Sequence, residues 1–252
     1  MDIHELKCDI INQFNFFQRV SKHSLKEVKA SGGCHGIGKE CFVQAQSRFR
    51  TQLCRGIIDK SSVKERPFIV AIDGLGGAGK STVANKLAEE LQSICVVKLI
   101  HIDNHIVESS KRYDTGHAEW YEYYYLQWDV ELLKNNMLLP LHNNNLQLQL
   151  PFYNQSSDTV NDRKIKLETN SIFIIEGVFL LRHEWRNFYD YRLFLDIPRT
   201  VREERVLQRD AYIGDFQARL NKYQRRYWPA EEYYLEKENP LATADKICDF
   251  SK

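Results

Sequence analysis

The run from Pro67 to Thr82, PFIVAIDGLGGAGKST, constrains the fold of this chain more than any other segment. It joins a short apolar stretch, Phe68–Ile72, to a G-x-x-x-x-G-K-S spacing that begins at Gly74. Glycines at this spacing let backbone N–H groups curl around phosphate oxygens, which a Cβ atom would obstruct. The run therefore predicts a strand, a loop that binds a nucleoside triphosphate, and a helix whose positive end faces the same anion. The predicted nucleotide-binding residues are Gly74, Gly76, Gly77, Ala78, Gly79, Lys80, Ser81 and Thr82.

The same segment also contains the G-x-G-x-x-G pattern of dinucleotide-binding folds, at Gly74, Gly76 and Gly79. Asp103 lies near the distance at which such folds carry an acid for the ribose. A dinucleotide-binding turn does not need Lys80-Ser81 after its last glycine, whereas a triphosphate loop needs the lysine for the β- and γ-phosphates and the hydroxyl for Mg²⁺. We therefore favour the triphosphate interpretation.

The bulk composition excludes several classes of partner. The 252 residues include 35 Lys and Arg against 34 Asp and Glu, so the net charge suits neither a nucleic-acid nor a membrane surface. The six cysteines form no C-x-x-C pair, which favours reduced thiols. The first residues do not resemble a signal peptide, and no apolar run is long enough to cross a bilayer. We expect a cytoplasmic protein without nucleic-acid or membrane partners; a homo-oligomeric state is left open.

Residues 1–66 differ from the rest and are predicted to form a helical N-terminal extension that packs on a main domain, 67–252. Apolar residues recur at helical spacing in two segments, one from Ile3 to Phe17 and one from Phe42 to Leu53. Between them, Ser24 and Glu27 have the form of a capping box, which predicts the start of a short helix. The purpose of the extension is not readable from these patterns.

From Pro67 onward, short apolar runs alternate with helical patterns. Continuous apolar strands separated by helices indicate a parallel sheet covered on both faces, the three-layer α/β/α arrangement. In such sheets, ligands bind beyond the carboxyl ends of the strands. The predicted strands are Phe68–Ile72, Val96–Ile102, Ser171–Ile175 and Tyr191–Leu195, and the predicted helices include Ser81–Gln92, Trp128–Asn135 and Val201–Arg209.

Three acids stand at or just after strand ends: Asp103, Glu176 and Asp196. A phosphoryl-transfer site needs one acid to orient Mg²⁺ and often another to accept the proton of the acceptor hydroxyl. For Asp103 and Glu176 we favour such a role. For Asp196 we favour a turn into the next helix, because a T-x-x-E capping box follows at Thr200 and Glu203.

Three arginines, Arg202, Arg205 and Arg209, follow at spacings that place them on one face of a predicted helix. Three positive charges along one face repel one another unless negative charge lies nearby, and Asp210 supplies only part of that negative charge. A triphosphate would supply the rest, because guanidinium groups bind phosphate bidentately. A solvated surface helix is the alternative.

In order, the segments AIDGLGGAGKST, HIDNH, PFY, IIEGVFLL, RxxRxxxRD and ADKI resemble those of uridine kinase-like proteins, in the phosphoribulokinase/uridine kinase group of P-loop kinases. The resemblance covers roughly residues 67–247. It implies a P-loop kinase domain over 67–252 with a lid at about 200–235, and ATP and Mg²⁺ as cofactors. It also implies that Asp103 is the catalytic base, that Glu176, with Ser81 and Asp103, belongs to the magnesium site, and that Tyr153 contacts the acceptor.

The same resemblance assigns four residues to the lid that covers the phosphates: Arg202, Arg205, Arg209 and Asp210. The predicted catalytic residues are therefore Asp103, Lys80 and the three arginines. One departure is Asn104-His105, where relatives carry an aromatic residue that walls the acceptor pocket. His105 is therefore a predicted substrate contact of unusual type.

These features predict an ATP-dependent kinase of a small hydroxylic acceptor, with a nucleoside such as uridine first. Nicotinamide riboside, pantothenate, a sugar phosphate and glycerate are alternative acceptors. A nucleotide-binding regulatory protein with little turnover is an alternative of another class, and a GTPase is disfavoured because no N-K-x-D or T-K-x-D motif occurs.

Overall fold

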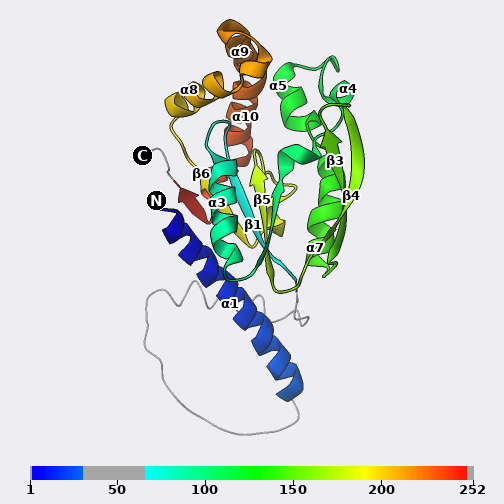
Figure 1. Ribbon diagram of the computed structural model, residues 1–252, viewed down its shortest axis with the longest axis vertical. Coiled ribbons are helices and arrows are strands. Elements are labelled where there is room, and N and C mark those ends of the chain that lie inside the picture. The colour runs from blue at the N-terminus through cyan, green and yellow to red at the C-terminus, as the bar shows by residue number, and fades with distance from the viewer. Residues whose placement is uncertain (1, 31–65, 249–252) are drawn as a thin grey trace.

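The computed structural model of the chain describes residues 2–30 and 66–248 (Figure 1). Within these residues, a parallel sheet has the strand order β2-β5-β1-β6-β7. The sequence-based prediction of an α/β fold with a parallel sheet is confirmed, although the last strand was not predicted. The strands are β1 (Phe68–Gly74), β2 (Val96–His101), β5 (Ser171–Gly177), β6 (Tyr191–Leu195) and β7 (Lys246–Cys248).

The strands β1 and β5 are buried along their whole length because both of their faces are covered, and their middle residues are continuously apolar. Every residue of β1 and of β5 is buried, and the strands pair in parallel with Ile69 opposite Phe173 and Ile72 opposite Glu176. The edge strand β2 is different, since Val96 and Lys98 are exposed and Ile100 is buried. Burial on two faces therefore explains the continuous apolar runs that marked the centre of the sheet.

One face of the sheet is covered by α3 (Lys80–Gln92) and by α1 (Ile3–Ala30). Leu6, Ile10 and Phe14 of α1 are buried in the same cluster as Phe68 at the start of β1. Polar contacts add to this packing, since the Tyr191 hydroxyl donates to the Asp9 carboxylate at 2.6 Å. The helical N-terminal extension is confirmed for α1.

The structure differs from the prediction at the expected start of a second helix in the extension. Ser24 and Glu27 lie inside α1, so they do not begin a separate helix. The helical pattern carries straight through these residues from Ile3 and needs no new start there. The predicted segment Phe42–Leu53 lies outside the described residues, and the division at residue 66 stays a prediction.

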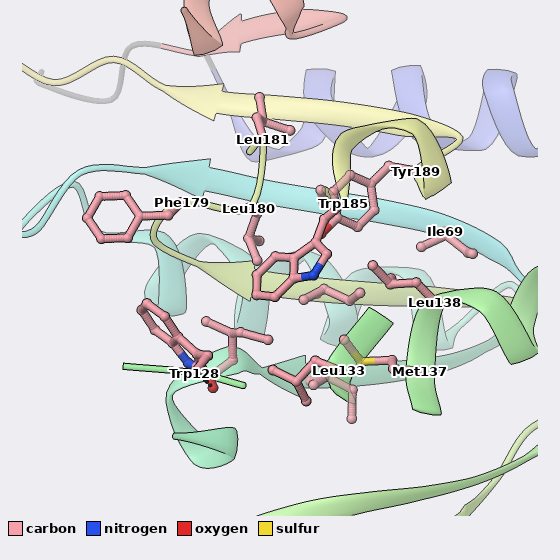
Figure 2. Packing of buried hydrophobic residues seen from close by; sticks show 14 of the residues in the cluster. Ile69, Trp128, Leu133, Met137, Leu138, Phe179, Leu180, Leu181, Trp185 and Tyr189 are labelled. Carbon is pink, nitrogen blue, oxygen red and sulfur yellow. Dashed lines mark hydrogen bonds between the residues drawn. The ribbon is translucent and has the colours of Figure 1, made fainter. Parts of the chain in front are cut away.

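The other face of the sheet packs against a second cluster of buried side chains (Figure 2). Trp128, Met137 and Leu138 come from the segment between β2 and β5, while Phe179 and Trp185 follow β5. That segment contains η1 (Ile102–His105), α4 (Ser109–Arg112), α5 (Glu119–Tyr121), η2 (Glu122–Leu126), α6 (Val130–Leu133), η3 (Lys134–Leu138), α7 (Leu139–His142) and the hairpin strands β3 (Gln147–Asn154) and β4 (Thr159–Lys166).

The predicted helix Trp128–Asn135 was placed too early and ended too soon. Asp129 caps the helix, with its side chain accepting from the Leu132 N–H at 2.9 Å, so Trp128 precedes it. Helical turns then continue to His142 despite Pro140, which stands in the first turn of α7. The antiparallel β3–β4 hairpin was not predicted.

After β6 the chain is mostly helical, through α8 (Arg199–Arg209), η5 (Ala211–Ile213), α9 (Phe216–Lys222), η6 (Tyr223–Tyr227), α10 (Trp228–Glu238) and α11 (Pro240–Thr243). Figure 1 shows α8, α9 and α10 on the side of the molecule toward which the strands point. These elements include the predicted lid, about 200–235. Among the described helices, none is long and apolar enough to cross a membrane.

Candidate active site

A cleft of about 990 Å³ lies at the carboxyl ends of β1, β2 and β5. Five predicted site residues from four elements line it: Lys80 and Ser81 of α3, Asp103 of η1, Glu176 of β5 and Tyr153 of β3. The order of the parallel strands explains the convergence, because β2, β5 and β1 are neighbours and end at one edge.

The loop between β1 and α3 has the backbone shape that its glycines permit. Gly77 and Gly79 have φ angles of +80° and +86°, which residues with a Cβ rarely adopt. Gly79 precedes the helix without a side-chain cap, so the N–H groups of the first turn of α3 stay open to an anion. Lys80 lies across this loop, where its Nζ donates to the Leu75 carbonyl at 3.0 Å.

Lys80 and Asp103 are charged groups of the same cleft, and each shifts the pKa of the other. The Lys80 side chain is buried, whereas Asp103 is exposed to the cleft. Burial lowers the pKa of the Lys80 ammonium, while the nearby Glu176 and Asp103 carboxylates act in the opposite direction. Although Asp103 is open to the cleft, desolvation by the many protein atoms around it raises the pKa of its carboxyl, and Lys80 opposes that shift. A carboxylate of raised pKa at the rim of a phosphate loop is suited to accept a proton.

Ser81, in the first turn of α3, and Glu176, near the end of β5, bring two side-chain oxygens together. The Ser81 hydroxyl donates to Glu176 Oε1 at 3.0 Å, and His101 Nδ1 lies 2.5 Å from the same oxygen. Hydroxyl and carboxylate oxygens are the ligands that Mg²⁺ prefers, and Asp103 adds a further negative charge nearby. The chemistry of these oxygen groups fits a magnesium ion. His101 was missed as a partner of Glu176, although it stands in the HIDNH segment.

The three arginines of α8 do not act as one face toward the cleft. Arg202 is buried, and its guanidinium donates to the Gly76 carbonyl at 3.1 Å and to Glu231 at 2.9 Å. Arg205 donates to the Gly77 carbonyl at 3.2 Å. Arg209 alone of the three lines the cleft, and it pairs with Asp210 at 2.6 Å. The missing negative partner is Glu231, which lies in α10 and which sequence spacing gave no signal for.

A second acid under the loop also went unnoticed. The Asp73 carboxylate is fully buried and accepts from the Gly74 N–H at 2.6 Å, the Leu181 N–H at 2.9 Å and the Tyr234 hydroxyl. Desolvation raises the pKa of this carboxyl. Asp73 therefore fastens the start of the phosphate loop to α10 and to the segment after β5.

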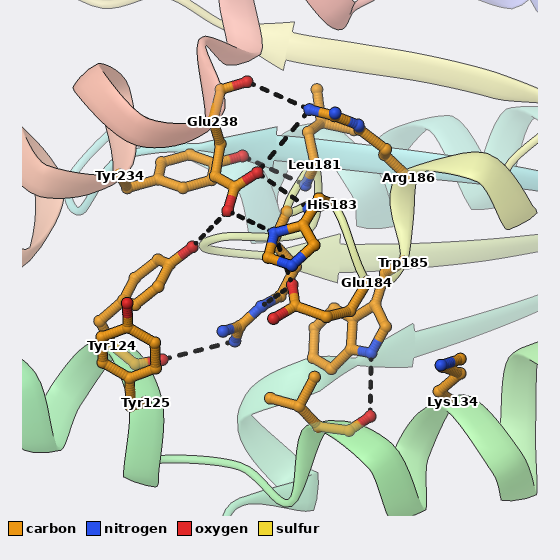
Figure 3. Close-up of polar contacts among 12 residues, drawn as sticks. Tyr124, Tyr125, Lys134, Leu181, His183, Glu184, Trp185, Arg186, Tyr234 and Glu238 are labelled. Atoms are coloured by element: carbon orange, nitrogen blue, oxygen red, sulfur yellow. Dashed lines mark hydrogen bonds and ion pairs between the residues drawn. The ribbon is translucent and has the colours of Figure 1, made fainter.

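A polar cluster next to that contact has donors and acceptors but little capacity for a metal (Figure 3). Ligand atoms of His183, Glu184 and Glu238 lie within 4.8 Å of one another. However, Tyr124 donates to Glu238 at 2.9 Å and Arg182 donates to Glu184 at 3.0 Å, so protein donors already use the carboxylates. The cluster ties the end of α10 to the segment after β5.

The far end of the cleft is built from the hairpin and α4. Arg112 donates to the Tyr153 hydroxyl at 3.2 Å, and that hydroxyl donates to the Asp158 carboxylate at 2.8 Å. Neither Arg112 nor Asp158 was singled out from the sequence. Aromatic rings supply much of the remaining wall, namely Tyr113, Tyr123, Tyr212, Tyr223 and Tyr227.

His105 is turned away from this wall. Its side chain is buried, Nδ1 lies 2.6 Å from the Pro151 carbonyl, and its ring meets Phe152 edge-on at 4.6 Å. Asn104 and Ile106 line the cleft on either side of it, but His105 does not. The predicted contact between His105 and a substrate is therefore not supported, because the His105 side chain does not line the cleft. Burial lowers the pKa of the imidazole.

Asp196 lies away from the main cleft, as expected for a strand-end acid without a role there. It borders a smaller cavity of about 260 Å³ beside Leu75 and α8. The predicted capping box is wrong, because α8 begins at Arg199 and its N-cap position is Pro198, so Thr200 lies within the helix.

The parallel sheet, the glycine-rich loop and the acids at neighbouring strand ends together define a P-loop kinase fold. The model of the phosphoribulokinase/uridine kinase family matches residues 69–226, more than half of the chain. This chain belongs to that family.

Several curated relatives that this chain matches are named uridine kinase. A uridine kinase of Limosilactobacillus reuteri (strain DSM 20016) is 28% identical over 148 residues, which are 58% of this chain and 66% of that protein. A uridine kinase of Clostridium botulinum (strain Okra / Type B1) is 29% identical over 158 residues, 58% of this chain and 70% of that protein. The match thus spans about two thirds of these relatives.

A solved structure, described as that of "a Possible Uridine Kinase from Bacillus stearothermophilus", is 40% identical. It covers 81% of this chain and 100% of that chain, with a TM-score of 0.63.

Proposed function

We propose that this chain is an ATP-dependent kinase that transfers the γ-phosphoryl group to a hydroxyl of a small acceptor, with uridine the first candidate. One observation carries the proposal: a phosphate loop with Lys80, an oxygen pair suited to Mg²⁺, and the carboxylate of Asp103 share one cleft. Phosphoryl transfer needs these parts together, since it depends on positioning and charge stabilisation.

The roles follow from where each side chain lies. The N–H groups at the start of α3 and the Lys80 ammonium hold the β- and γ-phosphates. Ser81 and Glu176, with Asp103 near them, would hold a Mg²⁺ ion, which would supply positive charge to stabilise the phosphates. The acceptor oxygen forms a bond to the γ-phosphorus, the bond from that phosphorus to the bridging oxygen of ADP breaks, and the hydroxyl proton moves to Asp103. Arg209 lines the cleft and can stabilise the moving charge.

Uridine is placed first because the named relatives are uridine kinases, and because tyrosine rings in the cleft could stack on a base. Tyr153 lies at the acceptor end, as the family resemblance implies. Nicotinamide riboside, pantothenate, a sugar phosphate and glycerate remain alternative acceptors. A regulatory protein with little turnover is disfavoured because Lys80, Ser81, Asp103 and Glu176 share one cleft. A cytoplasmic location stays a prediction from the sequence.

An ATP-consumption assay with a panel of these acceptors tests the proposal. We expect uridine to raise ATP turnover well above the rate with ATP alone. If no acceptor raises turnover while the protein still binds ATP, the kinase proposal fails and the regulatory alternative replaces it. Turnover with another acceptor but not with uridine would keep the kinase and correct its substrate.

A further inference from the structure

A buried ion pair between Arg202 and Glu231 contacts the phosphate loop at Gly76. Neither residue has a role in the phosphoryl transfer proposed above. Both side chains are less than a tenth exposed. Arg202 borders the smaller cavity beside Leu75 and not the main cleft, whereas Glu231 lies at the boundary of both. The position of Arg202 does not suit a residue that binds the phosphate directly.

The pair holds both polar groups of one residue in the loop. Glu231 Oε1 accepts from the Gly76 N–H at 2.7 Å, while Glu231 Oε2 accepts from Arg202 Nη1 at 2.9 Å. The same Nη1 donates to the Gly76 carbonyl at 3.1 Å, and Nε of Arg202 donates to the Ile197 carbonyl at 3.0 Å. The N–H and the C=O of Gly76 are therefore fixed by α10 and α8 together.

The next residue shows how close α8 comes to the loop. A Cβ on Gly77 would lie 2.6 Å from the Arg202 carbonyl oxygen and 2.9 Å from a methyl of Val206. Arg205 adds a hydrogen bond to the Gly77 carbonyl at 3.2 Å. The backbone that must present its N–H groups to a triphosphate is thus shaped from below by α8 and α10.

We propose that Arg202 and Glu231 are positioning residues that preorganise the phosphate loop for ATP, and that Arg202 acts through the backbone of Gly76 rather than by contact with a phosphate. The opposite charges also cancel next to the loop, so that the Glu231 carboxylate does not repel a triphosphate. For its ligand, this inference rests on the proposed function.

The variant Glu231→Gln separates the two roles that Arg202 could have. A glutamine has one acceptor oxygen and one NH₂ group, so it must turn a donor toward either the Gly76 N–H or Arg202, which are both donors. If the pair positions the loop, the dissociation constant for ATP rises about tenfold. If Arg202 instead binds phosphate and Glu231 only holds it back, freeing Arg202 lowers that constant, and the inference is overturned.

A matched control lies on the same two helices. Arg199 of α8 pairs with Glu232 of α10 at 2.8 Å, both exposed and without a contact to the loop. Glu232→Gln should leave the ATP dissociation constant unchanged. Equal weakening in Glu231→Gln and Glu232→Gln would show a general effect of α8–α10 docking and would contradict the inference.

Steady-state rates and a double variant complete the test. The KM for ATP should rise in Glu231→Gln and in Arg202→Met, while kcat at saturating ATP changes less than about threefold because neither side chain touches the reacting atoms. The double variant should bind ATP no more weakly than the worse single variant, since the two act as a unit. A fall in kcat at saturating ATP, or purely additive losses, would overturn the inference.

Arg202→Lys is a conservative variant that still tests the inference if the other variants do not fold. It keeps the charge but cannot reach Glu231 and two carbonyl groups at once, so ATP should bind more weakly than to the unaltered protein while the fold survives. ATP binding as tight as in the unaltered protein would count against the inference. If the unaltered protein itself binds no ATP, the proposed function fails instead, and the two failures are distinguishable.

Discussion

The donor half and the acceptor half of the cleft are built in different ways. The donor half is mainly backbone. The N–H groups in the first turn of α3 stay open, and Asp73, Arg202 and Glu231 hold the loop before them by hydrogen bonds to Gly74 and Gly76. The acceptor half is mainly side chains, with Tyr153, Arg112 and several tyrosine rings brought from separate helices and a hairpin. A backbone site tolerates little change in sequence, whereas a side-chain site can change its ligand by substitution. A sequence motif can therefore indicate the donor of the phosphoryl group, whereas no such motif indicates the acceptor.

Among the variants that compare the two halves, the largest effect is expected at the centre of the donor half. Lys80→Met removes the ammonium that lies across the loop while keeping most of the apolar stem. We expect kcat to fall about 10²- to 10³-fold, because a preorganised donor to the transferring phosphoryl group is lost. The acceptor dissociation constant should not change. Steady-state kinetics and calorimetry measure the two quantities, and weakened acceptor binding would contradict the separation of the halves.

Ser81→Ala tests the metal part of the donor half. Removing the hydroxyl takes away one oxygen ligand and the hydrogen bond to Glu176. The Mg²⁺ concentration that gives half-maximal activity should rise about tenfold, with activity recovered at high Mg²⁺. A magnesium titration of the rate checks this. Ser93→Ala, at the exposed far end of α3 and outside the cleft, is the control. An unchanged Mg²⁺ requirement in Ser81→Ala would exclude the proposed ligand.

A substitution in the acceptor half should change the KM for the acceptor and leave the KM for ATP unchanged. Tyr153→Phe removes the hydroxyl that joins Arg112 to Asp158. We expect the KM for the acceptor to rise about five- to tenfold, because the two charged groups lose their common partner, and the KM for ATP to stay constant. Tyr233→Phe, which removes a hydroxyl outside the cleft, is the control. Equal changes in both KM values would mean that the halves are not separate.

The smallest effect is expected at His105. His105→Gln keeps a donor for the Pro151 carbonyl, and its side chain lies behind the wall rather than in the cleft. The acceptor KM should change less than about threefold, although the unfolding temperature can fall through lost contact with Phe152. Kinetics and thermal unfolding are measured on the same preparation. A large rise in the acceptor KM would restore His105 as a substrate contact.

The sequence was sufficient for features that depend on local chemistry. Continuous apolar runs marked the buried parallel strands β1 and β5, and glycine spacing marked the loop where positive φ angles occur. Asp103 and Glu176 could be placed in one site because parallel strands end at one edge.

Features that depend on distant partners were not predictable. Glu231 lies 155 residues after Gly76, and no spacing connects a turn of α10 with the loop. Arg202 and Arg209 share a helix face in sequence, yet close packing of α8 on Gly77 holds one beneath the loop while the other reaches the cleft. His105 was assigned to the acceptor by its position in a motif, but the hairpin residues Pro151 and Phe152 take up its ring.

The central claim is that one cleft moves the γ-phosphoryl group of ATP to a hydroxyl, with Asp103 as the base between the two halves. Transfer of label from [γ-³²P]ATP to uridine, beside a parallel reaction with [α-³²P]ATP, tests it most directly. We expect labelled product from the γ-labelled donor only, and about 10²- to 10⁴-fold slower labelling in Asp103→Asn with nearly unchanged ATP affinity. Label from the α position, or an Asp103→Asn variant that transfers phosphate at the rate of the unaltered protein, would contradict the account.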